Sequence, residues 1–268
     1  MEDFHAPLMF ALEAKRQGRP LLLMLDYDGT LVEIAPRPEL ARPAQELLEL
    51  LGRLTSRADL KVMVVSGRPV RDLQAMLPVP GLDLLGSHGG EVFVDGRLHP
   101  LPAAAVNVDN EEMCRWRRRL AAKLEDFPGW WLEDKPLGFA LHYRQVPEEH
   151  IDKFLIILAG WQEQLRQEGR LQLLAGKKVL EILPPGVSKG LAIMNILLLP
   201  GFLRFFPIYF GDDTTDESAF LLLQGHGLTI KVGRPSTETA ASHFLPDPEA
   251  VRHFLALLAP PWRTPNGE

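Results

Sequence analysis

A short segment that is apolar at every position and ends at an aspartate constrains the fold of this chain most. The segment runs from Leu21 to Leu25 and is followed directly by Asp26. A half-exposed strand alternates apolar and polar residues, whereas a strand that is apolar throughout is typical of a parallel sheet covered by helices on both faces. The sequence therefore predicts a buried strand with a carboxylate at its carboxyl end.

The same pattern recurs along the first hundred residues, with an amphipathic helical segment after each of the first two strands. The predicted strands span residues 21–25, 61–65 and 82–85, and the predicted helices begin at Pro43 and Pro69. A hairpin follows over 91–98, because Asp95-Gly96 suits its tight turn. This alternation predicts an α/β fold with a doubly wound parallel sheet.

The middle of the chain changes to a different pattern, a helix followed by two strands, which occurs twice. The predicted helices carry apolar stripes over 113–127 and 151–165, and the strand pairs cover 130–143 and 171–183. The parallel pattern then resumes, with helices over 188–199, over 214–223 and from Pro248, and with strands over 207–210 and 228–232. We therefore expect a discontinuous core domain, residues 1–102 and 184–268, with an inserted α+β cap domain, residues 103–183.

Composition narrows the classes of partner. Among 268 residues the net charge is −6, which disfavours nucleic acid and anionic lipid as partners. The single cysteine, Cys114, excludes an intramolecular disulfide and a cysteine-built zinc site, and fits a reducing cytoplasmic setting. No apolar run is long enough for a membrane span. The sequence does not determine the oligomeric state, and it is compatible with a monomer.

Carboxylates gather after two of the predicted core strands, where ligands bind in open α/β sheets. Asp26 and Asp28 follow the first strand, and the strand over 207–210 is followed by Asp212, Asp213 and Asp216. A set of carboxylate oxygens favours Mg²⁺ over zinc. Taken alone, each acidic group also reads as a turn or a helix cap.

Two groups could balance this negative charge if the substrate is an anion. Ser66 follows the second strand, where its hydroxyl and neighbouring N–H groups can hold a phosphate oxygen. Lys189 lies at the start of a predicted helix and can neutralise phosphate as a point charge. The ordered set of acids, serine and lysine indicates phosphate chemistry more strongly than any one of them.

The order D-Y-D-G-T, S-G-R, K-G and G-D-D-T-T-D-E resembles the four motifs of the haloacid dehalogenase (HAD) superfamily of phosphohydrolases. The inserted segment resembles the large α/β cap of that superfamily. Finer strings resemble those of trehalose-6-phosphate phosphatases, namely G-S-H-G-G-E at 86–91, F-A-L-H-Y-R at 139–144 and G-K-K-V-L-E-I-L-P at 176–184.

The resemblance implies a mechanism. Asp26 would be the nucleophile that forms an aspartyl-phosphate, and Asp28 would shuttle the proton. Mg²⁺ would be held by the Asp26 carboxylate, the Asp28 carbonyl and Asp212, with support from Asp213 and Asp216. Ser66 and Lys189 would clamp the transferring phosphoryl group.

The resemblance also implies a substrate, trehalose 6-phosphate, whose hydrolysis is the last step of trehalose biosynthesis. The substrate-binding residues that it implies lie in the core and in the cap. They are Gly67, Arg68, His88 and Glu91 in the core and Arg144, Lys178 and Glu181 in the cap.

Two alternatives stay open at this point. One is a phosphatase for another sugar phosphate, such as sucrose-phosphate, against which only the cap strings argue. The other is a non-catalytic sugar-phosphate sensor, which would be expected to lack one of Asp26, Asp28, Lys189 or Asp212, and all four are present.

Overall fold

The computed structural model describes residues 5–99, 110–234 and 238–259, and these form two compact units. Unit 1 comprises Met1–His99 and Ser188–Glu268, and unit 2 comprises Pro100–Val187. Residues 184–187, which the sequence pattern assigned to the core, group with unit 2, and the predicted boundary at 102–103 lies outside the described residues. In the described ranges, no helix has both the length and the apolar character that a membrane crossing requires.

Unit 1 is built on one sheet with the strand order β12-β11-β10-β1-β2-β3-β4-β5. All neighbours from β12 to β3 pair in parallel, and β4 and β5 add an antiparallel hairpin at the edge. The strands are β1 Leu21–Asp26, β2 Leu60–Val65, β3 Asp83–Gly86, β4 Glu91–Val94, β5 Arg97–His99, β10 Phe206–Gly211, β11 Leu228–Val232 and β12 His243–Leu245.

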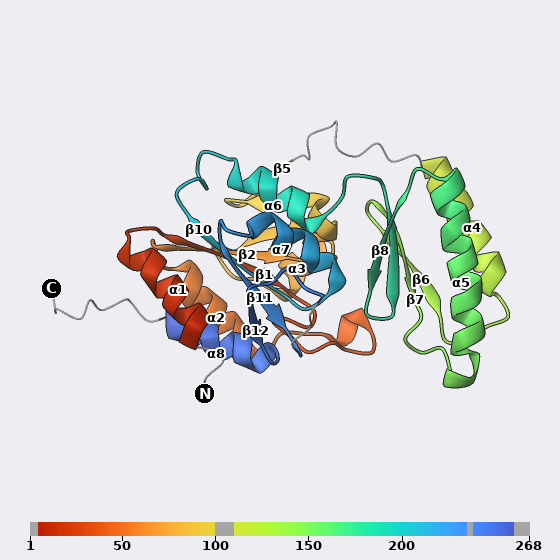
Figure 1. Ribbon diagram of the computed structural model, residues 1–268, viewed down its shortest axis with the longest axis horizontal. Helices are drawn as coiled ribbons and strands as arrows, with labels where there is room; N and C mark the ends of the chain where they lie inside the picture. The colour runs from red at the N-terminus through yellow and green to blue at the C-terminus, as the bar shows by residue number, and fades with distance from the viewer. Residues whose placement is uncertain (1–4, 100–109, 235–237, 260–268) are drawn as a thin grey trace. The chain divides into compact units, whose positions relative to one another are not determined.

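Helices cover both faces of this sheet, as Figure 1 shows for α2 and α8 on one side and α6 on the other. Alternate residues of β1 enter two separate cores: Leu21, Leu23 and Leu25 pack on one side, and Leu22 and Met24 on the other. This two-sided burial explains why β1 is apolar at every position. The first core includes α1 His5–Arg16, α2 Gln45–Thr55, α3 Val70–Met76 and α8 Pro248–Leu258, and the second includes α6 Lys189–Leu197 and α7 Glu217–Leu223.

The parallel pairing brings three strand ends to one edge of the sheet. Asp26 is the last residue of β1, Ser66 follows β2, and Asp212 follows β10. Because β1 lies between β2 and β10, the fold gathers these polar groups around the end of one central strand.

Unit 2 is a four-stranded antiparallel sheet in the order β6-β7-β9-β8, with α4 and α5 packed on one face. Trp116 of α4 and Trp161 of α5 meet edge to face at a centroid distance of 5.8 Å in the core of this unit. Residues that alternate with the core positions of the strands lie on the other face, which α4 and α5 do not cover. The elements are α4 Asn110–Leu124, β6 Trp131–Lys135, β7 Gly138–His142, α5 Glu148–Glu168, β8 Gln172–Gly176 and β9 Val179–Leu183.

Candidate active site

Lys189 joins two of the predicted acids at the carboxyl edge of the unit 1 sheet. Its Nζ lies 2.7 Å from Asp26 Oδ1 and 2.7 Å from Asp216 Oδ1, and all three side chains are buried. Lys189 begins α6, where Ser188 caps the helix by accepting a hydrogen bond from the Leu191 N–H. The cap fixes the start of α6, and therefore the point from which the lysine reaches the acids.

Asp216 accepts hydrogen bonds from three groups of unit 1. Besides the bond from Lys189, it accepts hydrogen bonds from the Tyr209 hydroxyl at 2.6 Å and from the Asp213 N–H at 2.9 Å. Asp213 caps the single 3-10 turn Thr214–Asp216 and forms a reciprocal capping box with Asp216. The predicted cap therefore exists, and it also holds Asp216 against Lys189.

Burial, neighbouring charges and hydrogen bonds shift the pKa values of Asp26, Lys189 and Asp216. Burial raises the pKa of Asp26 well above its ordinary value, Lys189 offsets part of this rise, and Asp216 and Asp212 add to it. For Asp216 burial is the largest single effect and raises the pKa, but the charge of Lys189 and the hydrogen bonds from Lys189, Tyr209 and the Asp213 N–H together lower the pKa below its ordinary value. Burial opposes the charged form of Lys189, but Asp216 and Asp26 raise its pKa well above the ordinary value. Lys189 is therefore a fixed positive charge, whereas burial disfavours the charged form of Asp26 despite the attraction of Lys189.

The glycines of the two acidic motifs allow close approach. Gly29 has a φ of +87°, and a Cβ at this position would collide with the carboxylate of Asp212. A Cβ at Gly211 would collide in the same way with the carboxylate of Asp216. The D-x-D-G and G-D-D strings therefore need glycine because carboxylates occupy the space beside the backbone.

Asp28 is held by an arginine that the sequence analysis assigned to the substrate. Arg68 Nε and Nη2 each lie 2.7 Å from one Asp28 carboxylate oxygen, and Nη2 also donates to the Pro38 carbonyl at 2.9 Å. A bidentate pair of this kind fixes the plane as well as the position of a carboxylate. In this structure Arg68 therefore binds Asp28, the predicted proton shuttle.

The remaining predicted core residues lie in the turns after β2 and β3. Ser66 is buried, its Oγ accepts a hydrogen bond from the Arg68 N–H, and its carbonyl accepts one from the His88 N–H. Gly67 lies between Ser66 and Arg68 and is partly buried. Glu91 accepts hydrogen bonds from the Ser87 hydroxyl at 2.6 Å and from the first N–H of α3, that of Val70, at 3.2 Å. These bonds connect the two turns, so Glu91 has a structural task alongside any contact with substrate.

The acids fit a divalent cation. Asp26, Asp212 and Asp216 are buried and each offers an oxygen, and these three oxygens lie within 4.8 Å of one another. The donor set is entirely carboxylate oxygen, the chemistry that magnesium-class ions prefer. The raised pKa of Asp26 supports the fit, because a cation beside it would offset the burial and the neighbouring acids that raise this pKa.

The predicted cap residues lie within unit 2, one on β9 and two in the turns that follow β7 and precede β9. Glu181 is buried on β9, between Ala140 of β7 and Leu174 of β8. Arg144 donates to the Lys177 carbonyl at 2.8 Å, which brings the end of β7 to the turn that contains Lys178. Arg144 and Lys178 therefore occupy one end of the cap sheet, and Glu181 lies on the face that α4 and α5 do not cover.

The sequence analysis missed a polar network on that same face. Glu133 lies 2.7 Å from His142 Nε2 and 3.1 Å from Lys135 Nζ, and the side chain of Lys135 is only 8% exposed. Trp131 stacks on His142 with an interplanar angle of 5° and a centroid distance of 4.7 Å. Trp131, Glu133 and Lys135 alternate along β6, with Leu132, which packs on the core, between the first two, so their side chains lie on the face opposite the helices.

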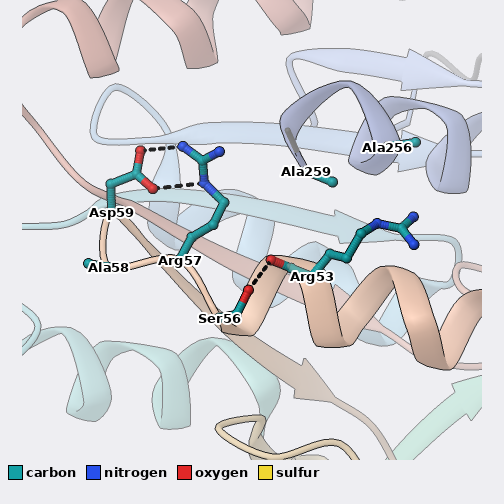
Figure 2. A pocket seen from close by; sticks show the side chains of 7 residues that line it. All are labelled: Arg53, Ser56, Arg57, Ala58, Asp59, Ala256 and Ala259. Carbon is teal, nitrogen blue, oxygen red and sulfur yellow. Dashed lines mark hydrogen bonds and ion pairs between the residues drawn. The ribbon is translucent and has the colours of Figure 1, made fainter. Parts of the chain in front are cut away.

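One large cavity of unit 1 lies far from this chemistry. It has a volume of about 640 Å³ and is lined in part by Ser56 to Asp59, the turn that leads into the start of β2, and by α8. Figure 2 shows Arg57 and Asp59 paired at its wall. Arg57 Nε lies 2.8 Å from Asp59 Oδ1, and Arg57 Nη2 lies 2.7 Å from Asp59 Oδ2. This turn is at the amino end of the parallel strands, opposite the acids, so the cavity is not part of the candidate active site.

Comparisons with known proteins identify relatives that cover most of this chain. The chain is 35% identical to a trehalose-6-phosphate phosphatase of Escherichia coli, over 80% of this chain and 78% of that protein. It is also 35% identical to a bifunctional trehalose-6-phosphate synthase/phosphatase of Thermoproteus tenax over 97% of this chain, and there it spans about a third (34%) of the relative.

A solved structure and a family model cover most of the chain. The C-terminal domain of the C. albicans trehalose-6-phosphate phosphatase superposes with a TM-score of 0.84 at 24% identity, covering 94% of this chain and 96% of that one, which supports the fold. The family model described as trehalose-phosphatase matches residues 24–249, a range that includes Asp26, Ser66, Lys189 and Asp212. The chain therefore belongs to the trehalose-phosphatase family.

Proposed function

We propose that this chain hydrolyses trehalose 6-phosphate to trehalose and phosphate through an aspartyl-phosphate on Asp26. The family is one of phosphoric monoester hydrolases, and the reaction is the last step of trehalose biosynthesis. The observation that carries the mechanism is the buried group of Asp26, Lys189, Asp212 and Asp216 at one sheet edge.

Two displacements at phosphorus make up the proposed reaction. In the first, an Asp26 oxygen bonds to phosphorus while the ester P–O bond breaks, and Asp28 gives a proton to the departing sugar oxygen. In the second, Asp28 takes a proton from water, whose oxygen bonds to phosphorus as the bond to Asp26 breaks. Each oxygen of Asp28 accepts one bond from Arg68, which leaves a second lone pair on each oxygen to carry the proton.

Lys189 and Ser66 act on the phosphoryl group. The transition state spreads charge over three phosphoryl oxygens, and the fixed charge of Lys189 compensates part of it. Asp216 keeps the lysine in place, because it is bonded to Lys189, Tyr209 and the Asp213 N–H together. The hydroxyl of Ser66 supplies a hydrogen bond to the same group.

Mg²⁺ is the cation that we propose, held by Asp26, Asp212 and the Asp28 carbonyl. When bound, it neutralises charge so that a carboxylate and a phosphate ester can approach each other. Asp213 and Asp216 support the site through the capping box.

We propose that the sugar is recognised by Arg144, Lys178 and Glu181 of the cap and by Gly67, Arg68, His88 and Glu91 of the core. Charged groups that bond to hydroxyls select one sugar because a wrong sugar leaves them unpaired. A cytoplasmic setting is part of the proposal and rests on the single cysteine.

The test is phosphate release from trehalose 6-phosphate, sucrose 6-phosphate and glucose 6-phosphate, with Mg²⁺ and with EDTA. We expect release from trehalose 6-phosphate only, and only with the metal. Asp26→Asn should lower turnover at least about a thousandfold, because removing a catalytic nucleophile has effects of this order. Asp83→Asn is the matched control, since Asp83 is another buried, lysine-paired aspartate of unit 1, away from the acids. Turnover by Asp26→Asn near the wild-type level would refute the nucleophile.

A further inference from the structure

Lys231, at the end of the sheet strand next to β10, contacts the acidic turn from outside the predicted motifs. It belongs to β11, and its Nζ donates a hydrogen bond to the Asp213 carbonyl at 2.9 Å. Asp213 directly follows Asp212, one of the three clustered acids. The side chain of Lys231 is 14% exposed, so the contact is shielded from most of the solvent.

Glu217 fixes Lys231 in turn. Its Oε1 lies 3.2 Å from Lys231 Nζ and accepts a hydrogen bond from Thr239 Oγ1 at 2.8 Å. Its Oε2 accepts a hydrogen bond from the Ala240 N–H at 2.9 Å. One carboxylate at the start of α7 therefore ties the lysine to the segment that precedes β12.

These contacts hold Asp213 from both ends of the residue. Its N–H is bonded to Asp216 at 2.9 Å, and its carbonyl is bonded to Lys231 at 2.9 Å. On the other side of Asp212, Gly211 ends β10 and is fixed by the sheet ladder. The backbone that carries the Asp212 carboxylate is thus anchored before and after that residue.

We infer that Lys231 and Glu217 are positioning residues that set the divalent-cation affinity of the site by holding the Asp212–Asp213 backbone in place. The inference rests on the cation site of the proposed function. Groups that orient a metal ligand without touching the metal commonly change affinity by about 10- to 100-fold when they are removed.

The opposite change in cation affinity is expected if Lys231 acts only through its charge. Removing a positive charge near a cation site would strengthen cation binding. Loss of an anchor would weaken it, because Asp212 would have to be ordered at the moment of binding. The direction of the change therefore separates the two explanations.

The experiment measures Mn²⁺ binding to the metal-free full chain from the electron paramagnetic resonance signal of the free ion, without substrate. Mn²⁺ is the probe because it accepts the same oxygen ligands as Mg²⁺. We expect Lys231→Met to raise the Kd about tenfold. We expect Lys231→Arg, which keeps a donor and the charge, to recover part of the affinity.

Lys61→Met is the matched control. Lys61 is also a partly buried lysine, 20% exposed, and it pairs with Asp83 and Asp95 at 3.1 and 2.7 Å. It lies near the amino end of β2, away from the acids, so its loss should leave Mn²⁺ affinity unchanged. Thermal melts of each variant report whether the fold is kept.

The double variant of Lys231→Met and Glu217→Gln gives a second measurement of Mn²⁺ affinity beside that of Lys231→Met. If the two residues form one anchor, the double variant should bind Mn²⁺ about as weakly as Lys231→Met. If only charge matters, the effects of the two substitutions on Mn²⁺ affinity should cancel, because one removes a positive charge and the other a negative charge. Unchanged or tighter binding in Lys231→Met, or cancellation in the double variant, would overturn the inference. Absence of Mn²⁺ binding by the wild type would overturn it as well, whereas an inert enzyme that still binds Mn²⁺ would count against the proposed reaction alone.

Discussion

Tyr27, between the two aspartates of the first motif, ties the turn after β1 to the core. Its side chain is fully buried, its hydroxyl donates to the Ala41 carbonyl at 2.9 Å, and Arg68 lies over its ring. Burial raises the pKa of Tyr27 from 10.0 to about 12, with a further rise from Asp28 and an opposing effect of Arg68. The folded state therefore favours the neutral phenol.

We expect Tyr27→Phe to change the pH dependence of stability. At pH 7 the variant should lose about 1 kcal/mol with the hydrogen bond. A raised folded-state pKa contributes stability that is complete below pH 10 and lost as pH rises through about 12. By pH 11 the wild type should lose roughly 1.4 kcal/mol that the variant does not lose, so the two should become nearly equal. Urea unfolding at both pH values measures this, and a constant difference would contradict the cause assigned to the pKa.

The contact between Arg68 and Asp28 could not be predicted from the sequence. Both residues were predicted to belong to the site, from motifs that are 40 residues apart. Their mutual contact depends on the side-chain directions of two neighbouring turns, which spacing does not specify. Lys231 was missed for a related reason, since a lysine at the end of a strand reads as solvent-exposed until its partners are known.

At the scale of elements, the apolar runs predicted every strand of the parallel sheet except β12. That strand has three residues and is defined by its pairing with β11, which no local pattern reveals. Helix α1 was also missed, because two of its three buried positions are alanines and its apolar stripe is weak. The predicted helix over 214–223 begins with a separate 3-10 turn, which the capping box of Asp213 and Asp216 stabilises.

The cap sheet carries a prediction about substrate choice. We expect Glu181→Ala to raise KM for trehalose 6-phosphate at least about tenfold, the effect of losing roughly 1.4 kcal/mol of binding. KM for p-nitrophenyl phosphate, which lacks a sugar, should change little. Asp134→Ala is the control, because Asp134 is an exposed cap carboxylate, paired with Arg117 of α4 on the helical side. Equal changes of KM for both substrates would remove Glu181 from sugar recognition.

At the scale of the whole molecule, cation binding should stabilise the fold by mass action. A ligand at a hundred times its Kd adds about 2.7 kcal/mol when it binds only the folded state. For a chain of this length we expect Mg²⁺ to raise the Tm by about 5–10 °C. Asp212→Asn should lose most of this increase, because it removes one of the three clustered acids. Calorimetry with Mg²⁺ and with EDTA checks this, and an equal increase in Asp212→Asn would place the ion elsewhere.

The two units have separate hydrophobic cores and carry different parts of the candidate site. Unit 1 carries the acids, Lys189 and Ser66, and unit 2 carries the polar face with Glu181. The bifunctional relative of Thermoproteus tenax contains a matching segment within a chain about three times as long.

Trapping the covalent intermediate tests the central claim most directly. The enzyme is mixed with trehalose 6-phosphate and Mg²⁺, quenched in acid within milliseconds, digested and examined by mass spectrometry. We predict a phosphoryl group on the peptide that contains Asp26, absent when Asp26→Asn is treated in the same way. A phosphoryl group on another peptide, or an unmodified Asp26 peptide during rapid turnover, would contradict the account.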